Sequence, residues 1–269
     1  MNNMAEKLKE KVKNKIKKEV ELKVDRHELI KILSEIKKVG NEAGCCISKD
    51  FMFANSGVLI MLKELAWMGD NEIIFHQPET ISKIEKLIRT IPTTEEIKFI
   101  LKDNYFIIKS DKRNIKFKMS NKILLNVYNK MLDKDVYNKY SKLCNGAYIE
   151  LTKDKFNEII TIADTLGSEV IRFTLNEDKT DIEIKLTKMD SSDEDESSVA
   201  YSEADFNIIG FKKAELKKEL KDIDTFAYSP EVFQRVPSTQ NFKFYFGIDG
   251  LGILLGEDGT KYAIAKIRD

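Results

Sequence analysis

Side chains that commonly carry out catalysis or bind metals are scarce in this sequence. It contains two histidines, His27 and His76, and three cysteines, Cys45, Cys46 and Cys144. The cysteine count is odd and includes no CxxC pair, which argues against a disulfide framework or a zinc site and favours a reducing compartment. No base that would activate a thiolate stands beside the adjacent cysteines. We therefore expect no catalytic residue, no metal and no cofactor.

Carboxylates are the remaining source of catalytic chemistry. Asp249, Glu257 and Asp258 lie close together in the sequence, but Asp249 and Asp258 each precede a glycine where a hairpin turn is expected. The acidic run 190–196 could bind a cation but lacks the spacing of a calcium loop. Glycine-rich phosphate loops, GxSxG and HExxH are all absent. A protein that is not an enzyme is the prediction, and a carboxylate enzyme is the weaker alternative.

Charged and apolar residues bound the class of protein. The 269 residues carry 45 Lys+Arg and 45 Asp+Glu, and 42% of them are hydrophobic. That length suits one large domain or two ordinary ones with buried cores. No apolar run approaches the ~18 residues of a membrane helix, and the lysine-rich N-terminus lacks the apolar segment of a secretory signal. We expect a cytoplasmic protein that does not bind membranes.

An internal repeat organises the chain. Residues 20–33 (VELKVDRHELIKIL) resemble residues 149–162 (IELTKDKFNEIITI) at an offset of 129. Residues 91–99 (IPTTEEIKF) resemble residues 236–244 (VPSTQNFKF) at an offset of 145. The second copy therefore holds about 16 additional residues between these segments, in an interval that contains the acidic segment 189–198, which has the composition of a solvated loop.

Each copy predicts the same series of elements: a strand, a helix, three strands, a second helix and three more strands. Asp25 and Thr152 (or Asp154) are suitable N-caps for the first helix of each copy. Apolar residues at helical spacing predict helices over 27–38, 80–90, 153–165 and 230–236. We divide the chain into a basic extension 1–18, domain 1 at 19–120, a connector 121–146, and domain 2 at 147–269 with an acidic loop 189–198.

The two helices of the first copy direct positive charge away from their apolar sides. Helix 27–38 has an apolar face of Leu29, Ile30, Leu33 and Ile36 and an opposite face of Lys31, Ser34, Glu35 and Lys38, with Lys37 at the margin. Helix 80–90 has an apolar face of Ile81, Ile84, Leu87 and Ile88 and an opposite face of Lys83, Lys86, Arg89 and Thr90. The second copy is less basic: helix 153–165 offers Lys153 and the last helix offers Arg235.

This repeated series of elements resembles the DNA sliding clamps, most closely the two-domain clamps of the proliferating-cell-nuclear-antigen kind and their phage counterparts. The segments that carry the resemblance are VELKVDRHELIKIL, IPTTEEIKF, FAYSPEVFQRVP and FKFYFGIDGLGILLGEDGTKYAIAKI. It extends over 20–118 and 147–267. The resemblance implies an α+β fold of two tandem similar domains, each with antiparallel sheets and two helices.

The resemblance also implies a function without catalysis. A sliding clamp is a processivity factor: a ring, here a homotrimer of six domains, that encircles duplex DNA without reading its sequence and tethers a DNA polymerase after a clamp loader has placed it. Mobile lysines and arginines that contact phosphates suit such sliding. The candidate DNA-binding residues are Lys31, Lys37, Lys38, Lys83, Lys86, Arg89, Lys153 and Arg235. The alternative is that these cations form ordinary solvated helix faces.

In the clamp family the connector and the C-terminal tail line an apolar pocket for partner peptides, a usual mode of peptide recognition. By this resemblance the candidate partner-binding residues are Leu124, Leu125, Val127, Ala263, Ile264 and Ile267. The alternative is a connecting helix that packs on the protein.

Two further hypotheses stay open. Extension 1–18, with seven lysines and two glutamates, is either a basic helix that adds DNA affinity or an unstructured tail. The weakly basic second copy also allows a clamp-fold scaffold or transcription co-factor that does not load on DNA. Abundant Lys, Ile and Asn fit an AT-rich genome, so we expect the cytoplasm of a bacterium or of a phage-infected host.

Overall fold

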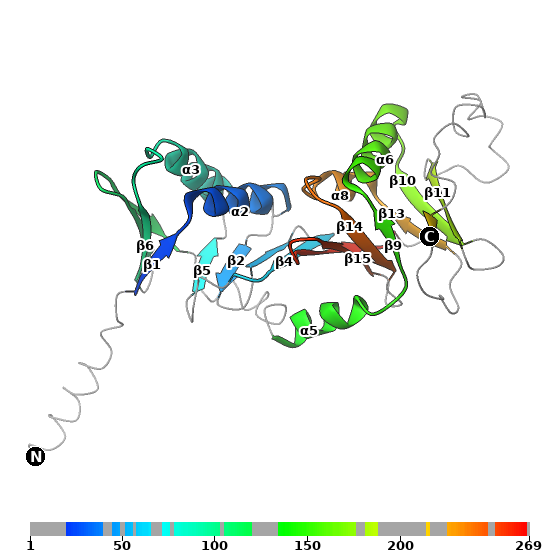
Figure 1. Cartoon of the computed structure of the whole chain (residues 1–269), viewed down its shortest axis with the longest axis horizontal. Coiled ribbons are helices and arrows are strands. Elements are labelled where there is room, and N and C mark those ends of the chain that lie inside the picture. The colour runs from blue at the N-terminus through cyan, green and yellow to red at the C-terminus, as the bar shows by residue number, and fades with distance from the viewer. Residues whose placement is uncertain are drawn as a thin grey trace, which may run out of the picture.

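A computed structural model gives the fold of the chain (Figure 1). It describes residues 20–39, 45–48, 52–55, 58–65, 72–75, 78–102, 105–119, 134–175, 181–187, 214–215, 225–246 and 251–267. The predictions that lie outside these residues are the extension 1–18, the acidic loop 189–198, His76, Asp249, and the partner-binding candidates Leu124, Leu125 and Val127.

The described elements repeat one unit, strand–helix–three strands, along the chain. The first unit is β1 (Val20–Val24), α2 (Arg26–Val39), β2 (Cys45–Ser48), β3 (Met52–Asn55) and β4 (Leu59–Lys63). The second is β5 (Glu72–Phe75), α3 (Pro78–Arg89), β6 (Ile97–Lys102), β7 (Tyr105–Lys109) and β8 (Asn114–Lys118). After α5 (Lys134–Leu143), the third is β9 (Tyr148–Leu151), α6 (Lys153–Leu166), β10 (Val170–Leu175), β11 (Asp181–Thr187) and β12 (Ala214–Glu215). The fourth is β13 (Thr225–Tyr228), α8 (Pro230–Gln234), β14 (Phe242–Phe246), β15 (Leu251–Gly256) and β16 (Lys261–Ala265).

Below, domain 1 denotes β1–β8 and domain 2 denotes β9–β16. The predicted α+β class with antiparallel sheets is confirmed. The predicted series lacked one strand in each copy: β5, which precedes α3, and β13, which precedes α8. The long helices end within two residues of their predicted bounds, and the last, α8, is shorter than predicted.

The first strand of each unit is exchanged between the two units of its domain. β1 pairs with β6 of the second unit, and β5 pairs with β2 of the first. β9 and β13 make the equivalent exchange with β14 and β10. The resulting sheets run β1-β6-β7-β8, β12-β11-β10-β13 and β5-β2-β3-β4-β16-β15-β14-β9 among the described strands. The exchange interlocks the units, so neither unit of a domain keeps its own sheet complete.

The eight-stranded sheet crosses from one domain to the other through antiparallel pairing of β4 with β16. Its register sets Met61 opposite Tyr262 and Leu59 opposite Ile264. Helices α2, α3, α6 and α8 lie on one side of this sheet, and α5 lies on the other (Figure 1). The surface formed by those four helices is called the helix face below.

Local sequence signals explain where the helices begin. The Asp25 carboxylate accepts a hydrogen bond from the Glu28 amide at 2.8 Å, and the Thr152 hydroxyl accepts one from the Lys155 amide at 3.2 Å. Both contacts satisfy amides in the first turn of a helix, which otherwise lack partners. The predicted caps Asp25 and Thr152 are therefore confirmed. The predicted turn at Asp258-Gly259 is confirmed as well, with Gly259 at φ +78° between β15 and β16.

One prediction for α2 needs correction. Ile32, which lies outside the predicted apolar face, is fully buried, and Glu35, predicted on the solvated face, is only 4% exposed. The Glu35 carboxylate accepts a hydrogen bond from Lys63 on β4 at 3.2 Å. This partner, distant in sequence, holds Glu35 in a buried position between α2 and the sheet. Leu29, Leu33 and Ile36 are buried as predicted.

Aromatic rings fill the core of domain 2. Phe173 lies 5.1 Å from Phe244 and 5.9 Å from Tyr228, measured between ring centroids. Gly252 of β15 lies directly against this cluster: a β-carbon there would be 2.6 Å from the Phe244 ring and 2.9 Å from the Tyr228 hydroxyl. The close approach of backbone and rings therefore requires glycine.

Substitution Gly252→Ala is expected to destabilise the protein by about 1–3 kcal/mol. The added methyl group overpacks the core, because the surrounding rings would have to shift to make room for it. Urea denaturation followed by circular dichroism measures the change. Thr161→Ala, at an exposed position of α6, is the control and should leave the free energy of unfolding nearly unchanged. A stability of Gly252→Ala equal to wild type would contradict this packing.

Candidate nucleic-acid interface

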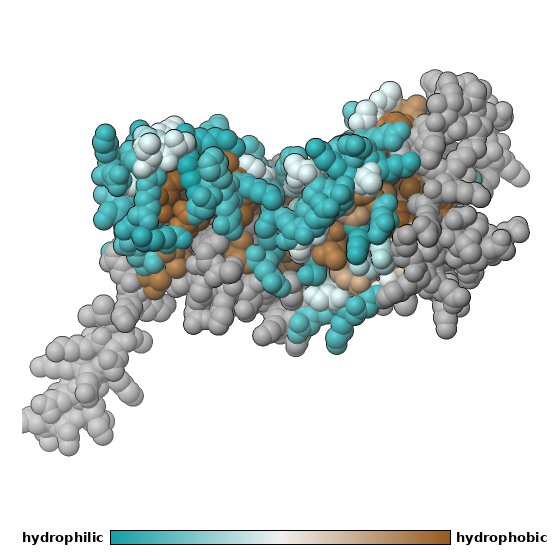
Figure 2. Space-filling model, in the orientation of Figure 1, coloured by the Kyte–Doolittle hydropathy of each residue, from teal (hydrophilic) through white to brown (hydrophobic). Residues whose placement is uncertain are grey.

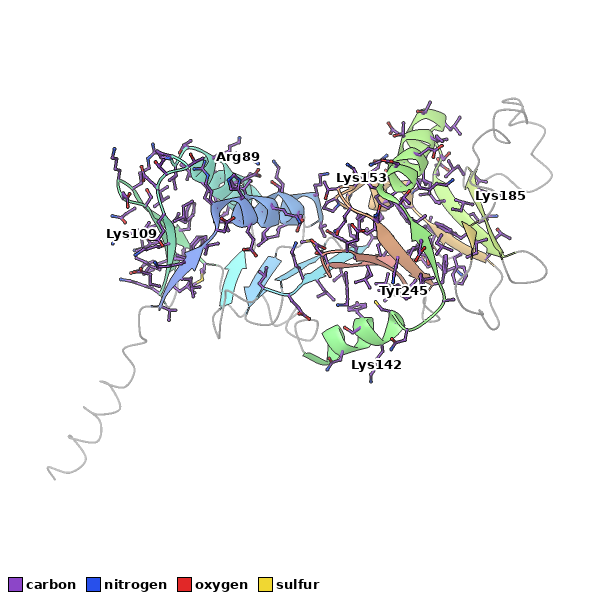
Figure 3. All side chains as sticks on the ribbon, in the orientation of Figure 1. Arg89, Lys109, Lys142, Lys153, Lys185 and Tyr245 are labelled. Atoms are coloured by element: carbon purple, nitrogen blue, oxygen red, sulfur yellow. The ribbon has the colours of Figure 1, made fainter. Side chains whose placement is uncertain are left out.

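The helix face is hydrophilic over α2, α3 and α6 (Figure 2). Arg89 on α3 and Lys153 at the start of α6 project on this side, whereas Lys142 projects from α5 on the opposite side (Figure 3). No described helix is long and apolar enough to cross a membrane. Among the described residues no group of three His, Cys, Asp or Glu side chains is placed to hold a metal ion.

The predicted cations of domain 1 are all exposed, but they differ in the ion pairs and hydrogen bonds that they form. Lys38 and Lys86 have no hydrogen-bond or ion-pair partner within the part of the chain that the structure describes. Lys83 pairs with Glu79 at 3.9 Å, and both side chains remain mostly exposed. Exposed pairs of this kind contribute little free energy, so Lys83 stays available to another anion.

The buried residue Glu85 of α3 contacts three polar side chains of α2 and α3. Its carboxylate accepts hydrogen bonds from Arg89 at 2.7 Å and from the Ser34 hydroxyl at 3.0 Å, and Lys37 lies 3.8 Å away. Burial alone would raise the pKa of this carboxyl group. The hydrogen bonds from Arg89 and Ser34 and the charge of Lys37 outweigh burial, so the pKa of Glu85 lies below its ordinary value. Glu85 thus ties α2 to α3 while holding two candidate DNA-binding cations.

Lys31 is shared between the two domains. Its amino group lies 3.4 Å from the Asp258 carboxylate in the β15–β16 turn and 3.8 Å from Glu35 on its own helix. Lys31 is 52% exposed, so it still faces solvent. Asp258, one of the carboxylates of the weaker enzyme alternative, accepts a hydrogen bond from Lys63 at 2.9 Å. Its neighbour Glu257 accepts one from Asn241 at 2.8 Å.

Two arginines that the sequence analysis missed lie at the C-terminal end of α3. Arg26 donates to the carbonyl groups of Ile91 and Arg89, and Arg113 donates to the Thr90 carbonyl at 3.1 Å. Cations stabilise the carbonyl end of a helix, where the last backbone acceptors lack partners. Arg26 begins α2 and Arg113 closes the β7–β8 turn, so only the folded chain brings them together.

Domain 2 presents a different helix face. Lys153 is exposed and Arg235 is half-buried, but α6 also exposes Asp154, Glu158 and Asp164. The charges of α6 therefore largely cancel, in contrast to the cationic surface of domain 1. The structure brings the six domain 1 candidates onto α2 and α3 and leaves Lys153 and Arg235 among acids and neutral groups.

The partner-binding candidates that can be described occupy three different environments. Ala263 is buried in an apolar cluster with Tyr140 of α5, and Ile264 is buried in the main core. Ile267 is half-buried, and its amide donates to the Ala227 carbonyl at 2.8 Å. Helix α5 itself packs through Tyr140, as the alternative of a packed connecting helix predicts. Of these three candidates, Ile267 alone has a partly exposed side chain.

Comparison with solved structures shows the fold. The chain is similar to a candidate DNA polymerase III beta subunit from Eubacterium rectale (TM-score 0.64, 14% identity, covering 94% of this chain and 67% of that chain). It is similar to a DNA polymerase sliding clamp from Pseudomonas aeruginosa (TM-score 0.63, 10% identity, 93% and 67%). It is also similar to the structure of the C-terminal region of FEN-1 bound to A. fulgidus PCNA (TM-score 0.55, 12% identity, 93% and 98%).

The chain has the DNA sliding clamp fold. The resemblance identified in the sequence is therefore confirmed at the level of the fold. No family model and no curated protein matches the sequence. The clamp-fold chain spans about two thirds of the bacterial clamp structures and almost the whole of the chain in the PCNA structure.

Substitution Glu85→Gln is expected to lower the free energy of unfolding at pH 7 by about 1–2 kcal/mol, because it removes the charge-assisted hydrogen bonds to Arg89 and Ser34. A carboxyl whose folded pKa is depressed contributes its full stability above the unfolded pKa of about 4.3 and loses it as the pH falls through the folded pKa. The difference between wild type and variant should therefore shrink between pH 5 and pH 3 in urea denaturation.

Glu79→Gln on the same helix is the matched control, since Glu79 is 84% exposed. Its effect should stay below about 0.5 kcal/mol at either pH. An effect of Glu85→Gln that is equally large at pH 3 and pH 7 would contradict an ionised, hydrogen-bonded Glu85.

Proposed function

We propose that this protein is a DNA sliding clamp: a non-enzymatic ring that surrounds duplex DNA and tethers a DNA polymerase. The observation that carries the proposal is the clamp fold together with its charge distribution. The exposed lysines and arginines of α2 and α3 lie on the helix face, on one side of the sheet. Lysine-rich helices without base-reading geometry suit contact with phosphates that allows sliding.

Ring closure uses the free edges of two sheets. β8 ends the first sheet and β12 ends the second, and the two sheets lie at opposite ends of the molecule (Figure 1). A head-to-tail contact of β8 in one copy with β12 in the next is heterologous and closes into a ring when the rotation fits. Within the chain, β4 and β16 already join two domains in this manner.

Three copies are the proposed assembly. In the comparison with the PCNA structure, nearly the whole length of both chains aligns, with 98% of that chain covered. A two-domain subunit of the same extent supports a homotrimer of six domains, as the sequence resemblance implies. The polymerase and the clamp loader are the proposed protein partners.

The direction of the backbone amides on β8 provides a test of this closure. The hydrogen bonds between Ser110 and Arg113 close the β7–β8 hairpin, and Ile107 lies opposite Lys116 in its register. Because hydrogen-bonded and non-hydrogen-bonded pairs alternate in an antiparallel ladder, the amide of Lys116 points away from β7, toward the open edge. Proline at this position removes an outward donor without removing a bond to β7.

Lys116→Pro is therefore expected to shift the protein from trimer to folded monomer in sedimentation equilibrium. Lys116→Ala keeps the amide and serves as the control, which should remain a trimer. Circular dichroism establishes that both variants are folded. A wild-type protein that is monomeric at every concentration, or a Lys116→Pro variant that assembles as wild type does, would overturn this closure.

Domain 1 should supply most of the DNA-binding charge, because its helix face carries more available cations than that of domain 2. The double variant Lys38→Ala/Lys86→Ala is expected to weaken DNA binding. It should also reduce the slope of log K against log salt by about 1 for each phosphate that a lysine no longer neutralises. Fluorescence anisotropy with duplex DNA over a salt series measures both quantities.

Two control variants separate the helix face from general charge effects. Lys142→Ala on α5 removes an exposed cation from the opposite side of the sheet and should leave the slope unchanged. Lys153→Ala tests the domain 2 candidate and should reduce DNA affinity and the salt slope less than the double variant does. If Lys142→Ala and the double variant changed DNA affinity and the salt slope equally, the helix face would not be the DNA-binding surface.

A clamp-fold scaffold that does not load on DNA is the second candidate function. The acidic residues Asp154, Glu158 and Asp164 on α6 favour it, since phosphate would be repelled along that helix. A salt-independent anisotropy signal, or no DNA binding at low salt, is the outcome that this candidate requires.

A further inference from the structure

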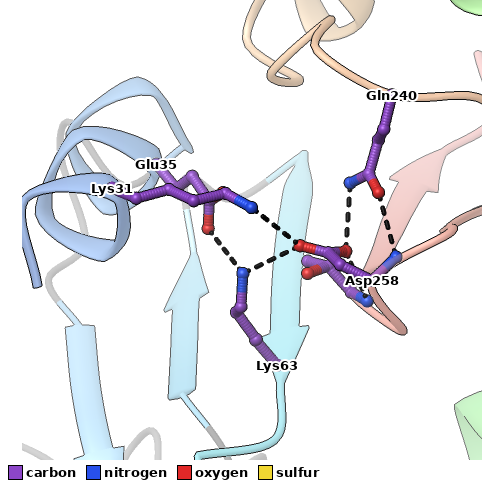
Figure 4. A network of polar contacts seen from close by, with 6 residues as sticks. Lys31, Glu35, Lys63, Gln240 and Asp258 are labelled. Carbon is purple, nitrogen blue, oxygen red and sulfur yellow. Dashed lines mark hydrogen bonds and ion pairs between the residues drawn. The ribbon is translucent and has the colours of Figure 1, made fainter. Parts of the chain in front are cut away.

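The junction between the two domains contains a partly buried charge network on its helix side (Figure 4). It consists of Lys31 and Glu35 from α2, Lys63 from β4, Asp258 from the β15–β16 turn, and Gln240 from the loop before β14. We call this group the inter-domain clasp. The DNA-binding proposal uses only Lys31 of these residues, and the core packing of the two domains uses none of them.

Strand pairing alone does not fix how the two domains are oriented. The β4–β16 ladder fixes register, but neighbouring strands in sheets adopt twists over a range of about 10 to 35°. Rotation about this one ladder would change the angle between the domains and strain its hydrogen bonds, which would then open more often. Side-chain contacts displaced from the sheet are needed to select one angle. On the α5 side, Leu62 of β4 packs with Tyr140 and Tyr245 in an apolar cluster, and such packing is not directional. On the helix side, the clasp supplies directional contacts between the domains.

The clasp joins the domains through alternating charges. Lys63 donates to Asp258 of domain 2 at 2.9 Å and to Glu35 of domain 1 at 3.2 Å. Lys31 reaches the same Asp258 oxygen at 3.4 Å. Lys63 is only 12% exposed, whereas Lys31 is 52% exposed. The contact from Lys63 is therefore the shielded one, and an anion on the helix face can occupy Lys31 without reaching Lys63.

The domain 2 side of the clasp is held rigidly. Gln240 donates to the Asp258 carboxylate and accepts from the Asp258 amide, both at 3.0 Å, and the Thr260 amide donates to the same carboxylate at 3.1 Å. Beside Gln240, the Asn241 side-chain carbonyl oxygen accepts from the Lys153 amide at the first turn of α6. Movement of Asp258 is thus coupled to the body of domain 2.

The ionised forms of Asp258 and Lys63 fit this arrangement, whereas burial outweighs the attraction of Lys63 and raises the pKa of Glu35 above its ordinary value. Burial disfavours the charged form of Asp258, but the hydrogen bonds from Lys63, Thr260 and Gln240 outweigh it and keep the pKa of Asp258 well below its ordinary value. Burial likewise disfavours charged Lys63, but Glu35 and Asp258 raise the pKa of Lys63 above its ordinary value. Removing one partner would leave a poorly hydrated, uncompensated charge, which is strongly unfavourable.

We propose that the inter-domain clasp sets the angle between domain 1 and domain 2, and that without the Asp258–Lys63 contact the β4–β16 junction becomes a hinge. This inference concerns a single chain, so it goes beyond the proposed function and holds whether or not the protein binds DNA. In a closed assembly the same contact would determine the curvature that each chain contributes.

Asp258→Asn provides the direct test, because it removes the charge and keeps the size of the side chain. Hydrogen exchange followed by mass spectrometry reports on the junction strands β4 and β16, and small-angle scattering reports on the spread of domain arrangements. We expect exchange at the β16-facing amides of β4 and the β4-facing amides of β16 to accelerate at least tenfold and the scattering to broaden. Exchange in the β14–β9 and β10–β11 ladders should stay at the wild-type rate.

Glu257→Gln is the matched control in the same turn, since Glu257 contacts Asn241 within domain 2. It should leave junction exchange at the wild-type rate. Unchanged junction exchange in Asp258→Asn would overturn the proposal, and so would equal acceleration throughout domain 2, which indicates general destabilisation. Should Asp258→Asn fail to fold, the double variant Glu35→Gln/Lys63→Gln removes the domain 1 charges of the contact as a pair, and the same localised acceleration is expected.

Discussion

The antiparallel pairing of β4 with β16 is the interaction on which the rest of the structure depends. It joins one four-stranded sheet of each domain into an eight-stranded sheet and so allows four helices to form a single surface. Strand edges carry unpaired amides and carbonyl groups that require partners. The chain pairs some of these edges by exchanging first strands within each domain and by joining the domains at β4–β16. β8 and β12 are two of the described strands that end a sheet, and their sheets lie at opposite ends of the molecule, which the proposed ring closure uses.

Electrostatics divides the helix face into two unequal halves. In domain 1, Glu85 and Glu35 are buried, so the exposed charges of the α2 and α3 surface come mostly from lysine and arginine. In domain 2, acids remain exposed on α6 beside Lys153. A formal charge of zero for the chain is therefore compatible with a locally cationic surface, because a partner responds to the distribution of charge and not to its sum.

Much of the fold could be predicted from the sequence because its signals are local. The repeat revealed the tandem domains, hydrophobic spacing revealed the long helices, and Asp25, Thr152 and Gly259 marked caps and a turn. The strand exchange left no such signal, since β1 pairs with β6 across more than seventy residues. Glu35 was assigned to the wrong face because its partner Lys63 lies on a distant strand. For the same reason, neither the contacts of Arg26 and Arg113 with the C-terminal end of α3 nor the role of Asp258 between the domains could be predicted without the folded chain.

Retention on DNA of different topology tests the proposed ring most directly. The protein is placed on nicked circular DNA and on linear DNA of equal length, and the bound fraction is followed after a shift to high salt. A ring that encircles DNA remains on the circle, where it has no end to pass, and leaves the linear molecule by sliding. Equal loss from both molecules would contradict encirclement and leave a clamp fold that serves another purpose.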